Sequence, residues 1–326
     1  MPTREDLQIL QAQDLELKVM LTKQRIREFV TKFTSQGVYI SFSGGKDSTV
    51  LLHLVREVYP DVEAVFVNTG LEYPEIQHFV KTIDNVKILY PTMKFPEVIK
   101  TYGYPFISKT VSHNVRIARN NPDGNVMKNI FNPHYKSLYS CYKYVELTND
   151  KHEIRISDQC CDIMKKAPIH LYEKETGKVD IVATMCCESK ARESAWFKTG
   201  CNAFEVRRIQ SKPMSFWTEQ DVLQYIKENN LPIASVYGDI TINNCKYCTT
   251  GCSRTGCIFC GFGAHLEKGE GRFQRLKRTH PKQYAFCMDG GEHNSEGIWQ
   301  PNKKGLGMKY VIDRLNDMYG DNFIKY

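Results

Sequence analysis

Short apolar runs alternate with amphipathic stretches between residues 38 and 226 of this chain. The apolar runs predict strands at 38–40, 62–70, 86–90 and 180–184. Helical spacing predicts helices at 49–59, at 95–101 and after Pro74, and Thr218, followed by acidic residues, has the pattern of a helix N-cap. This alternation predicts an α/β fold with a doubly wound parallel sheet, whose ligands bind at the carboxyl ends of the strands.

The regions around this core have other patterns. Residues 4–35 mix polar and apolar positions at helical spacing and predict one or two helices. Residues 110–150 are polar and rich in Asn, and predict a helix followed by an irregular flap. Cysteines and basic residues are frequent near the C-terminus. We therefore expect an N-terminal helical segment over 1–36, a nucleotide-binding α/β domain over 37–240, and a Cys-rich basic region over 241–326.

The segment between the first strand and its helix reads Ser-Phe-Ser-Gly-Gly-Lys-Asp-Ser over residues 41–48. Its adjacent glycines, Gly44 and Gly45, let the backbone approach a ligand closely. The start of the following helix is a natural anion site. We interpret the segment as a phosphate cradle, although its spacing is neither that of the Walker loop nor G-x-G-x-x-G. Its side-chain donors are Ser41, Ser43, Ser48 and Lys46.

This string resembles the signature of the PP-loop ATP pyrophosphatases, which split ATP between its α and β phosphates and leave AMP on an acceptor. Further strings at 68–75, 103–109, 185–192 and 213–226 resemble the adenylyl-sulfate and phosphoadenylyl-sulfate (PAPS) reductase branch of that group. The resemblance covers about residues 38–290. It implies an adenine nucleotide alpha hydrolase-like fold with a Cys-rich metal or iron–sulfur region at its C-terminus.

The resemblance also implies ATP and Mg²⁺ as ligands. Asp47 would help to hold Mg²⁺, and Lys46 would neutralise charge on the leaving pyrophosphate, with Ser48 as the third catalytic residue. The adenine would lie near residues 68–70, while Glu72 would orient the ribose or the metal. Acceptor or phosphate contacts would come from Glu188 and Arg192. The expected nucleotide-binding set is Ser41, Ser43, Gly44, Gly45, Lys46, Asp47, Ser48, Asn68, Thr69, Gly70, Glu72, Glu188 and Arg192.

The chain has 12 cysteines, and in a long chain without an export signal clustered cysteines indicate metal or redox chemistry. A vicinal pair and a distant C-x-x-C resemble the ligand set of the [4Fe–4S] cluster in adenylyl-sulfate reductases. That set is Cys160, Cys161, Cys257 and Cys260. Lys165, Lys166 and Arg254 would offset the charge of the thiolate-ligated cluster.

Zinc is the alternative metal, because five thiols lie close together in the sequence and could form a Cys₄ site by themselves. Spacing does not separate one iron–sulfur site from one zinc site, or from both. Two of these five thiols, Cys257 and Cys260, also belong to the iron–sulfur set. The other three are Cys245, Cys248 and Cys252.

Three classes of function compete. The first is an enzyme that adenylates an acceptor, such as tRNA or DNA, and supports iron–sulfur-dependent transfer of sulfur from a donor such as a cysteine desulfurase. The second is a sulfonucleotide reductase, which the intact phosphate loop and the lack of a cysteine after Cys287 disfavour. The third is a non-catalytic nucleotide or iron–sulfur binding module. Basic residues at 272–282 would follow a nucleic-acid backbone, with Phe273 stacking on a base, or would form a solvated helix face.

Composition is that of a globular protein, with 41% hydrophobic and 25% charged residues and a net charge of +7. No apolar run of about 18 residues predicts a membrane span, and no secretory h-region is evident near the N-terminus. We therefore expect a cytoplasmic protein without a membrane partner. The resemblance adds the expectation of a homodimer.

Overall fold

The computed structural model describes residues 2–134, 141–206 and 208–326, so residues 135–140 of the expected flap lie outside the described residues. The chain divides into two compact units, each built from separate segments. The first unit contains residues 1–68, 72–90 and 169–256. The second unit contains residues 69–71, 91–168 and 257–326. Each unit is described by itself.

A six-stranded sheet of order β3-β2-β1-β5-β7-β6 forms the centre of the first unit. All neighbouring strands are parallel except the antiparallel edge pair of β6 and β7. The order reverses at β1, which lies between β2 and β5, so the predicted doubly wound α/β sheet is confirmed. The strands are β1 (Val38–Ser41), β2 (Ala64–Val67), β3 (Val86–Leu89), β5 (Val179–Val182), β6 (Asn202–Ala203) and β7 (Gln210–Ser211).

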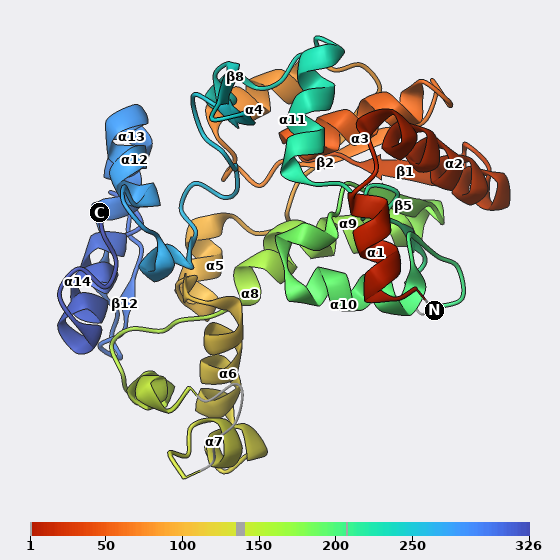
Figure 1. The fold of residues 1–326 in the computed structure, drawn as a ribbon. Coiled ribbons are helices and arrows are strands. Elements are labelled where there is room, and N and C mark those ends of the chain that lie inside the picture. The colour runs from red at the N-terminus through yellow and green to blue at the C-terminus, as the bar shows by residue number, and fades with distance from the viewer. Residues whose placement is uncertain (1, 135–140, 207) are drawn as a thin grey trace. The chain divides into compact units, whose positions relative to one another are not determined.

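Helices cover both faces of this sheet (Figure 1). On one face, α2 and α11 pack against α3. On the other face, the Tyr172 ring of α9 packs edge-on against Tyr39 of β1, with ring centroids 5.2 Å apart. The elements are α1 (Arg4–Gln11), α2 (Leu15–Phe33), α3 (Lys46–Arg56), α4 (Pro74–Lys81), α9 (Ala167–Thr176), η3 (Cys186–Glu188), α10 (Lys190–Thr199), α11 (Glu219–Glu228), η4 (Ser235–Tyr237), and the hairpin of β8 (Ile240–Asn243) and β9 (Lys246–Thr249).

The predicted N-cap of α11 is confirmed. The Thr218 hydroxyl accepts a hydrogen bond from the Asp221 backbone N–H, and the Asp221 carboxylate accepts one from the Thr218 N–H. The same carboxylate pairs with the buried Lys18 ammonium of α2 at 2.8 Å. Trp217 also donates from its indole N–H to the Thr22 hydroxyl of α2. These contacts attach α2 to the N-terminal end of α11.

The second unit combines helices with short strand pairs. Its β4 and β10 pair in parallel, and a Cβ on Gly261 would lie 2.2 Å from the Phe106 ring, so this position requires glycine. The elements are α5 (Phe95–Tyr102), β4 (Phe106–Ile107), α6 (Lys109–Asn120), α7 (Asn125–Ile130), η1 (Tyr142–Thr148), α8 (Gln159–Cys161), the π-helical η2 (Asp162–Lys166), β10 (Gly261–Phe262), η5 (Ala264–Leu266), α12 (Arg272–Thr279), α13 (Pro281–Met288), β11 (Glu292–His293), β12 (Trp299–Gln300) and α14 (Met308–Tyr319).

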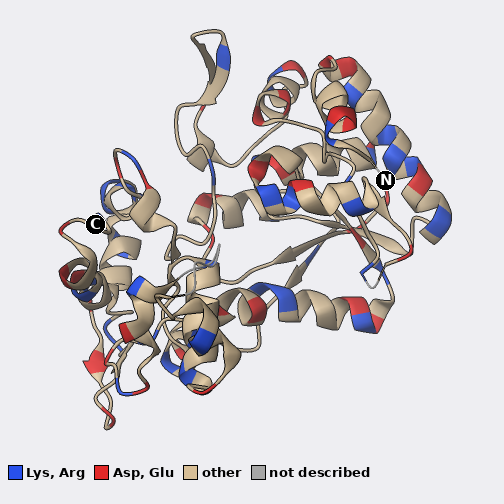
Figure 2. Ribbon diagram, turned by 60° about the horizontal axis from the view of Figure 1, so that its bottom comes forward, with Lys and Arg blue, Asp and Glu red and all other residues tan. Residues whose placement is uncertain are grey.

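Basic and acidic residues are interspersed along the helices (Figure 2). None of the helices in the described residues has the length and apolar character needed to cross a membrane. Many charges form ion pairs within one unit, and Glu153 is an example from the second unit. It accepts hydrogen bonds from the Tyr310 hydroxyl at 2.6 Å and the Arg314 guanidinium at 2.7 Å.

Candidate active site and cysteine cluster

The segment 43–48 forms a tight turn between β1 and α3. Gly44 has φ +70°, and a Cβ there would lie 2.8 Å from methyl groups of both Ile76 and Val80. Gly45 is the N-cap of α3 and supplies no side-chain cap. The first N–H groups of a helix have no intrahelical acceptor, so this end of α3 presents donors and the positive end of its dipole to a ligand.

Hydroxyl groups converge on this turn. The Ser43 and Ser48 hydroxyl oxygens lie 3.0 Å apart, and the Ser48 hydroxyl also donates to the Gly45 carbonyl. Sequence reasoning missed two more groups. The Tyr237 hydroxyl accepts a hydrogen bond from the Lys46 backbone N–H at 3.2 Å and lies 2.7 Å from the Thr255 hydroxyl. Tyr237 and Thr255 come well after the last strand of the sheet in the sequence, and no phosphate-binding motif surrounds either residue.

Lys46 is buried, with 3% of its surface exposed, and its ammonium group is surrounded by acceptors. It donates to the Ser253 carbonyl at 3.1 Å and lies 3.2 Å from a Glu219 carboxylate oxygen. Asp47 Oδ1 lies 3.6 Å from the same ammonium. A buried ammonium with this many oxygen neighbours is well placed to exchange one of them for a phosphate oxygen.

The Asp47 carboxylate fits a role as a cation ligand. Burial raises its pKa, an effect that Lys46 and Arg254 only partly offset. Its Oδ1 is buried and has no hydrogen-bond partner among the described residues, although the Lys46 ammonium lies 3.6 Å away. A buried carboxylate oxygen in this state is costly unless a cation or donor compensates it. Oxygen ligands next to substrate phosphates are those that Mg²⁺ prefers.

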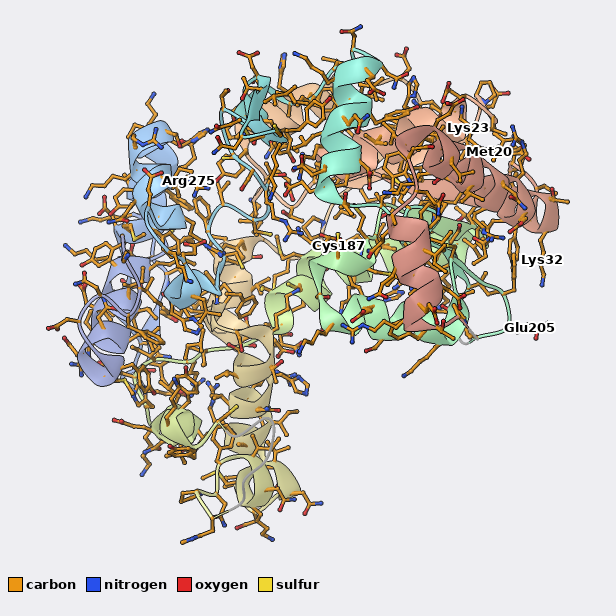
Figure 3. All side chains as sticks on the ribbon, viewed as in Figure 1. Met20, Lys23, Lys32, Cys187, Glu205 and Arg275 are labelled. Carbon is orange, nitrogen blue, oxygen red and sulfur yellow. The ribbon has the colours of Figure 1, made fainter. Side chains whose placement is uncertain are left out.

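The segment after β5 brings further charged groups to the same unit. Glu188, the last residue of η3, forms ion pairs with both Arg192 and Arg254. Arg254 was expected to offset cluster charge, but the structure pairs it with Glu188 and it acts on the pKa of Asp47 instead. Cys187, labelled in Figure 3, is an exposed residue, but its thiol is partly buried, and this burial together with nearby Asp47 raises the pKa of the thiol.

The remaining nucleotide-site candidates lie near the ends of β1 and β2. Ser41 is the last residue of β1, and Asn68 directly follows β2, which pairs in parallel with β1. Asn68 and Glu72 belong to the first unit, whereas Thr69 and Gly70 belong to the second. Within the second unit the Thr69 hydroxyl accepts a hydrogen bond from the Leu71 N–H at 3.1 Å. The structure thus brings Ser41 and Asn68 to the edge of the sheet that carries the loop.

The four cysteines of the expected cluster all belong to the second unit. A hydrogen bond from Cys160 lowers the pKa of the Cys161 thiol, and the positive charges of Lys109 and Lys165 lower it further. The hydrogen bond to Cys161 and burial raise the pKa of Cys160, and nearby Cys260 and Cys257 add to this effect. Lys109 and Lys165 therefore favour the thiolate form of Cys161.

Thiolates and neighbouring cations suit a cluster chemically. Within residues 2–134, 141–206 and 208–326, however, no group of three His, Cys, Asp or Glu side chains is arranged to hold a metal ion. Cluster binding would require the thiols to turn toward a common centre. The first cysteine of the pair is buried, and the other three are partly exposed.

The cysteines of the zinc alternative are distributed over both units. Cys245 is exposed at the turn of the β8–β9 hairpin with φ +60°, and Cys248 lies on β9. Cys252 is buried in the first unit, whereas Cys257 and Cys260 belong to the second. The geometry of the described residues selects neither metal.

The basic stretch at 272–282 forms α12 and the start of α13. The proposed stacking role of Phe273 is wrong, because its side chain is completely buried and packs on Phe106 with ring centroids 6.4 Å apart. Arg275, labelled in Figure 3, and Arg278 both pair with Glu270. This pairing favours the interpretation of the stretch as a solvated helix face over that of a nucleic-acid contact.

Comparison with known proteins identifies a family. The model of the phosphoadenosine phosphosulfate reductase domain matches residues 37–105 and 92–261. The adenosine 5'-phosphosulfate reductase of Staphylococcus haemolyticus is 24% identical over 213 residues, which cover 65% of this chain and 70% of that protein. An uncharacterised protein of Methanocaldococcus jannaschii is 23% identical over 281 residues, which cover 82% of this chain but 45% of that protein.

Among solved structures, the PAPS reductase from Candida auris in its phosphate complex is 17% identical, with a TM-score of 0.41. The likeness covers 74% of this chain and 96% of that one. A TM-score below 0.5 is too low to indicate a shared substrate.

Proposed function

The chain belongs to the phosphoadenosine phosphosulfate reductase domain family, and from this premise we propose that it is an ATP pyrophosphatase that adenylates an acceptor and supports sulfur transfer to it. The observation that carries the proposal is the complete phosphate loop, with the Lys46 ammonium buried beside the Asp47 carboxylate. A sulfonucleotide substrate has no β,γ-pyrophosphate, so it would leave these groups without a ligand.

In the proposed reaction, an oxygen of the acceptor attacks the α-phosphorus of ATP. The bond between the α-phosphorus and the α,β-bridging oxygen breaks, and pyrophosphate leaves with the electron pair. Lys46 and the N-terminus of α3 stabilise the charge that develops on the leaving group. Mg²⁺ held by Asp47 would add further positive charge next to the leaving pyrophosphate. Asn68, Thr69, Gly70 and Glu72 are proposed to line the adenosine side.

Sulfur at the sulfide level would then bond to the acceptor atom that carries the adenylated oxygen, and the bond between that atom and the oxygen would break, so that AMP leaves with the oxygen and the electron pair. Persulfide sulfur from the donor would reach the sulfide level by taking two electrons from thiols, which form a disulfide. A [4Fe–4S] cluster held by Cys160, Cys161, Cys257 and Cys260 would supply a binding site for that sulfur. Lys109 and Lys165 support this assignment, because they surround Cys161 with positive charge. We propose a nucleic acid, tRNA or DNA, as the acceptor, with a cysteine desulfurase as the sulfur donor.

A reductase is the second candidate, because the Staphylococcus haemolyticus relative bears that name. One experiment separates the two functions. Purified protein is incubated anaerobically with radiolabelled ATP and Mg²⁺, with and without tRNA or DNA, and separately with adenylyl sulfate and a thiol reductant. We expect AMP and pyrophosphate from ATP, and no sulfite from adenylyl sulfate. Sulfite release without ATP cleavage would overturn the proposal.

Lys46→Ala and Lys23→Ala make a matched pair for this experiment. Lys46→Ala should abolish AMP formation. Lys23 also lies in the first unit and pairs with Glu57, but it is outside the loop, so Lys23→Ala should keep wild-type activity. Thermal unfolding of both variants shows whether either change acts through folding.

A further inference from the structure

Three consecutive residues after the β8–β9 hairpin contact three different parts of the phosphate site. The Ser253 carbonyl accepts a hydrogen bond from the Lys46 ammonium. Arg254 forms an ion pair with Glu188. The Thr255 hydroxyl lies 2.7 Å from the Tyr237 hydroxyl, which itself accepts from the Lys46 N–H. The backbone at Arg254 is therefore held beside the loop by both of its neighbours.

Arg254 shares its carboxylate partner with a second arginine. Glu188 is a single carboxylate, yet it pairs with two guanidinium groups, those of Arg192 and Arg254. The Arg254 side chain is 62% exposed, so it is not fixed by packing. Its charge also reaches the Asp47 carboxylate. Arg192 would remain paired with Glu188 if Arg254 left it, so Arg254 can move without leaving that carboxylate unpaired.

We propose that Arg254 is a catalytic residue, which moves from Glu188 to the phosphates of bound ATP when the acceptor reacts. This inference rests on the proposed adenylation. The guanidinium would donate hydrogen bonds to the non-bridging oxygens of the α-phosphate while the bond to pyrophosphate breaks. Arginine suits this task because its planar donors match phosphate geometry and its charge is permanent. Glu188 acts as the resting partner that keeps the side chain extended before ATP binds.

The backbone around Arg254 supports this assignment. Gly251 donates to the Tyr237 carbonyl, and Cys252 donates to the Val236 carbonyl, so the base of the hairpin is tied to η4. A Cβ on Gly251 would lie 2.3 Å from the Val236 carbonyl oxygen, so the segment after β9 approaches η4 as closely as glycine allows. A fixed backbone leaves the movement to the arginine side chain alone.

The test compares Arg254→Gln, Arg254→Lys and Arg4→Gln by steady-state kinetics of AMP formation. Arg4 is an exposed arginine of the same unit that pairs with Glu193, so its loss is the control. We expect Arg254→Gln to lower kcat by about 100–1000-fold, the loss typical of one transition-state donor, with a KM for ATP within about threefold of wild type. Arg254→Lys should restore part of kcat, and Arg4→Gln should match wild type.

The outcomes separate this inference from the proposed function. A wild-type chain that forms AMP, together with an Arg254→Gln variant whose kcat is within about threefold of it, overturns the catalytic role alone. A raised KM with unchanged kcat also overturns it, since it indicates ground-state binding. A wild-type chain that forms no AMP with any acceptor overturns both. Circular dichroism and thermal unfolding of Arg254→Gln should match wild type, because the exposed ion pair contributes little to folding.

Discussion

Lys18 of α2 and Asp221 of α11 form a buried ion pair, with the Lys18 ammonium 2.8 Å from one carboxylate oxygen and 2.9 Å from the other. The carboxylate also accepts from the backbone and hydroxyl of Thr218. One buried carboxylate thus joins the N-terminal helices to the cap of the helix that follows the sheet.

Replacement of Lys18 by Met should destabilise the protein strongly. The change leaves Asp221 buried without its counter-ion, which costs about 3–5 kcal/mol of unfolding free energy. Urea denaturation measures this loss. Lys23→Met is the control, because Lys23 pairs with Glu57 at a partly exposed site and should cost at most about 1 kcal/mol. Equal losses in the two variants would contradict the prediction.

Gly44→Ala should impair both folding and ATP cleavage. Its φ of +70° is unfavourable for alanine, and the added Cβ would approach Ile76 and Val80 to 2.8 Å. Gly177 is a matched control from the same unit, with φ +69° and no atom within 4 Å of an added Cβ. Gly177→Ala should therefore cost only about 1 kcal/mol of backbone strain and keep activity. Similar melting temperatures for both variants would show that the packing around Gly44 is unimportant.

Tyr237→Phe removes the hydroxyl that accepts from the Lys46 N–H. The phenyl ring keeps the packing, so the loss should be that of a hydrogen bond, about 0.5–1.5 kcal/mol in unfolding free energy. Thr255→Val removes the other member of the hydroxyl pair. If the two hydroxyls act together, the double variant should lose less than the sum of the single losses, as a double-mutant cycle measures. Strict additivity would contradict the coupling.

The stability that Glu153 provides should depend on pH. Burial alone would raise its pKa, but hydrogen bonds from Tyr310, Arg314 and His293 outweigh burial and lower the pKa from 4.5 to about 2. A carboxyl whose pKa is lowered by folding stabilises the protein above its unfolded pKa, and this contribution is lost as pH falls from about 4.5 toward 2. Glu153→Gln should thus reduce the melting temperature at pH 7, and the difference from wild type should shrink at pH 3. A constant difference would refute the linkage.

Metal content should distinguish the two cysteine sets. After anaerobic purification we expect iron and acid-labile sulfide in near-equal amounts, with a broad absorption band near about 400 nm. Alanine substitution at Cys160, Cys161, Cys257 or Cys260 should abolish all three signals. Substitution at Cys245 or Cys248 should leave them intact. Zinc alone, lost on substitution of Cys245 or Cys248, would instead establish the alternative set.

Local pattern was sufficient to predict the framework of the first unit. The apolar runs, Pro74 at the start of α4 and the Thr218 cap each depend on neighbours within a few residues, and the structure confirms them. The helix after the loop begins at Lys46 rather than Thr49, because Gly45 supplies an extended N-cap that hydrophobic periodicity does not reveal.

Contacts over long sequence separations were not predictable. Tyr237 and Thr255 reach the loop through tertiary structure, and hydroxyl groups in turn-rich segments have no distinguishing pattern. The predicted stacking of Phe273 on a base is wrong because the many basic residues of this stretch obscure its amphipathic pattern. The apolar side of the helix, which includes Phe273, is buried. Arg254 stands three residues before Cys257 in sequence, yet its ion pair is with Glu188, 66 positions away.

The contact between Lys46 and Ser253 joins residues that are 207 positions apart. A ribosome that adds about 5–20 residues per second makes Ser253 roughly 10–40 s after Lys46. During that interval Lys46, which is buried in the complete protein, still lacks its carbonyl partner in the nascent chain. Completion of the phosphate site is therefore a late event in biosynthesis, and a chain interrupted before residue 253 would carry the loop sequence without the groups that hold it in shape.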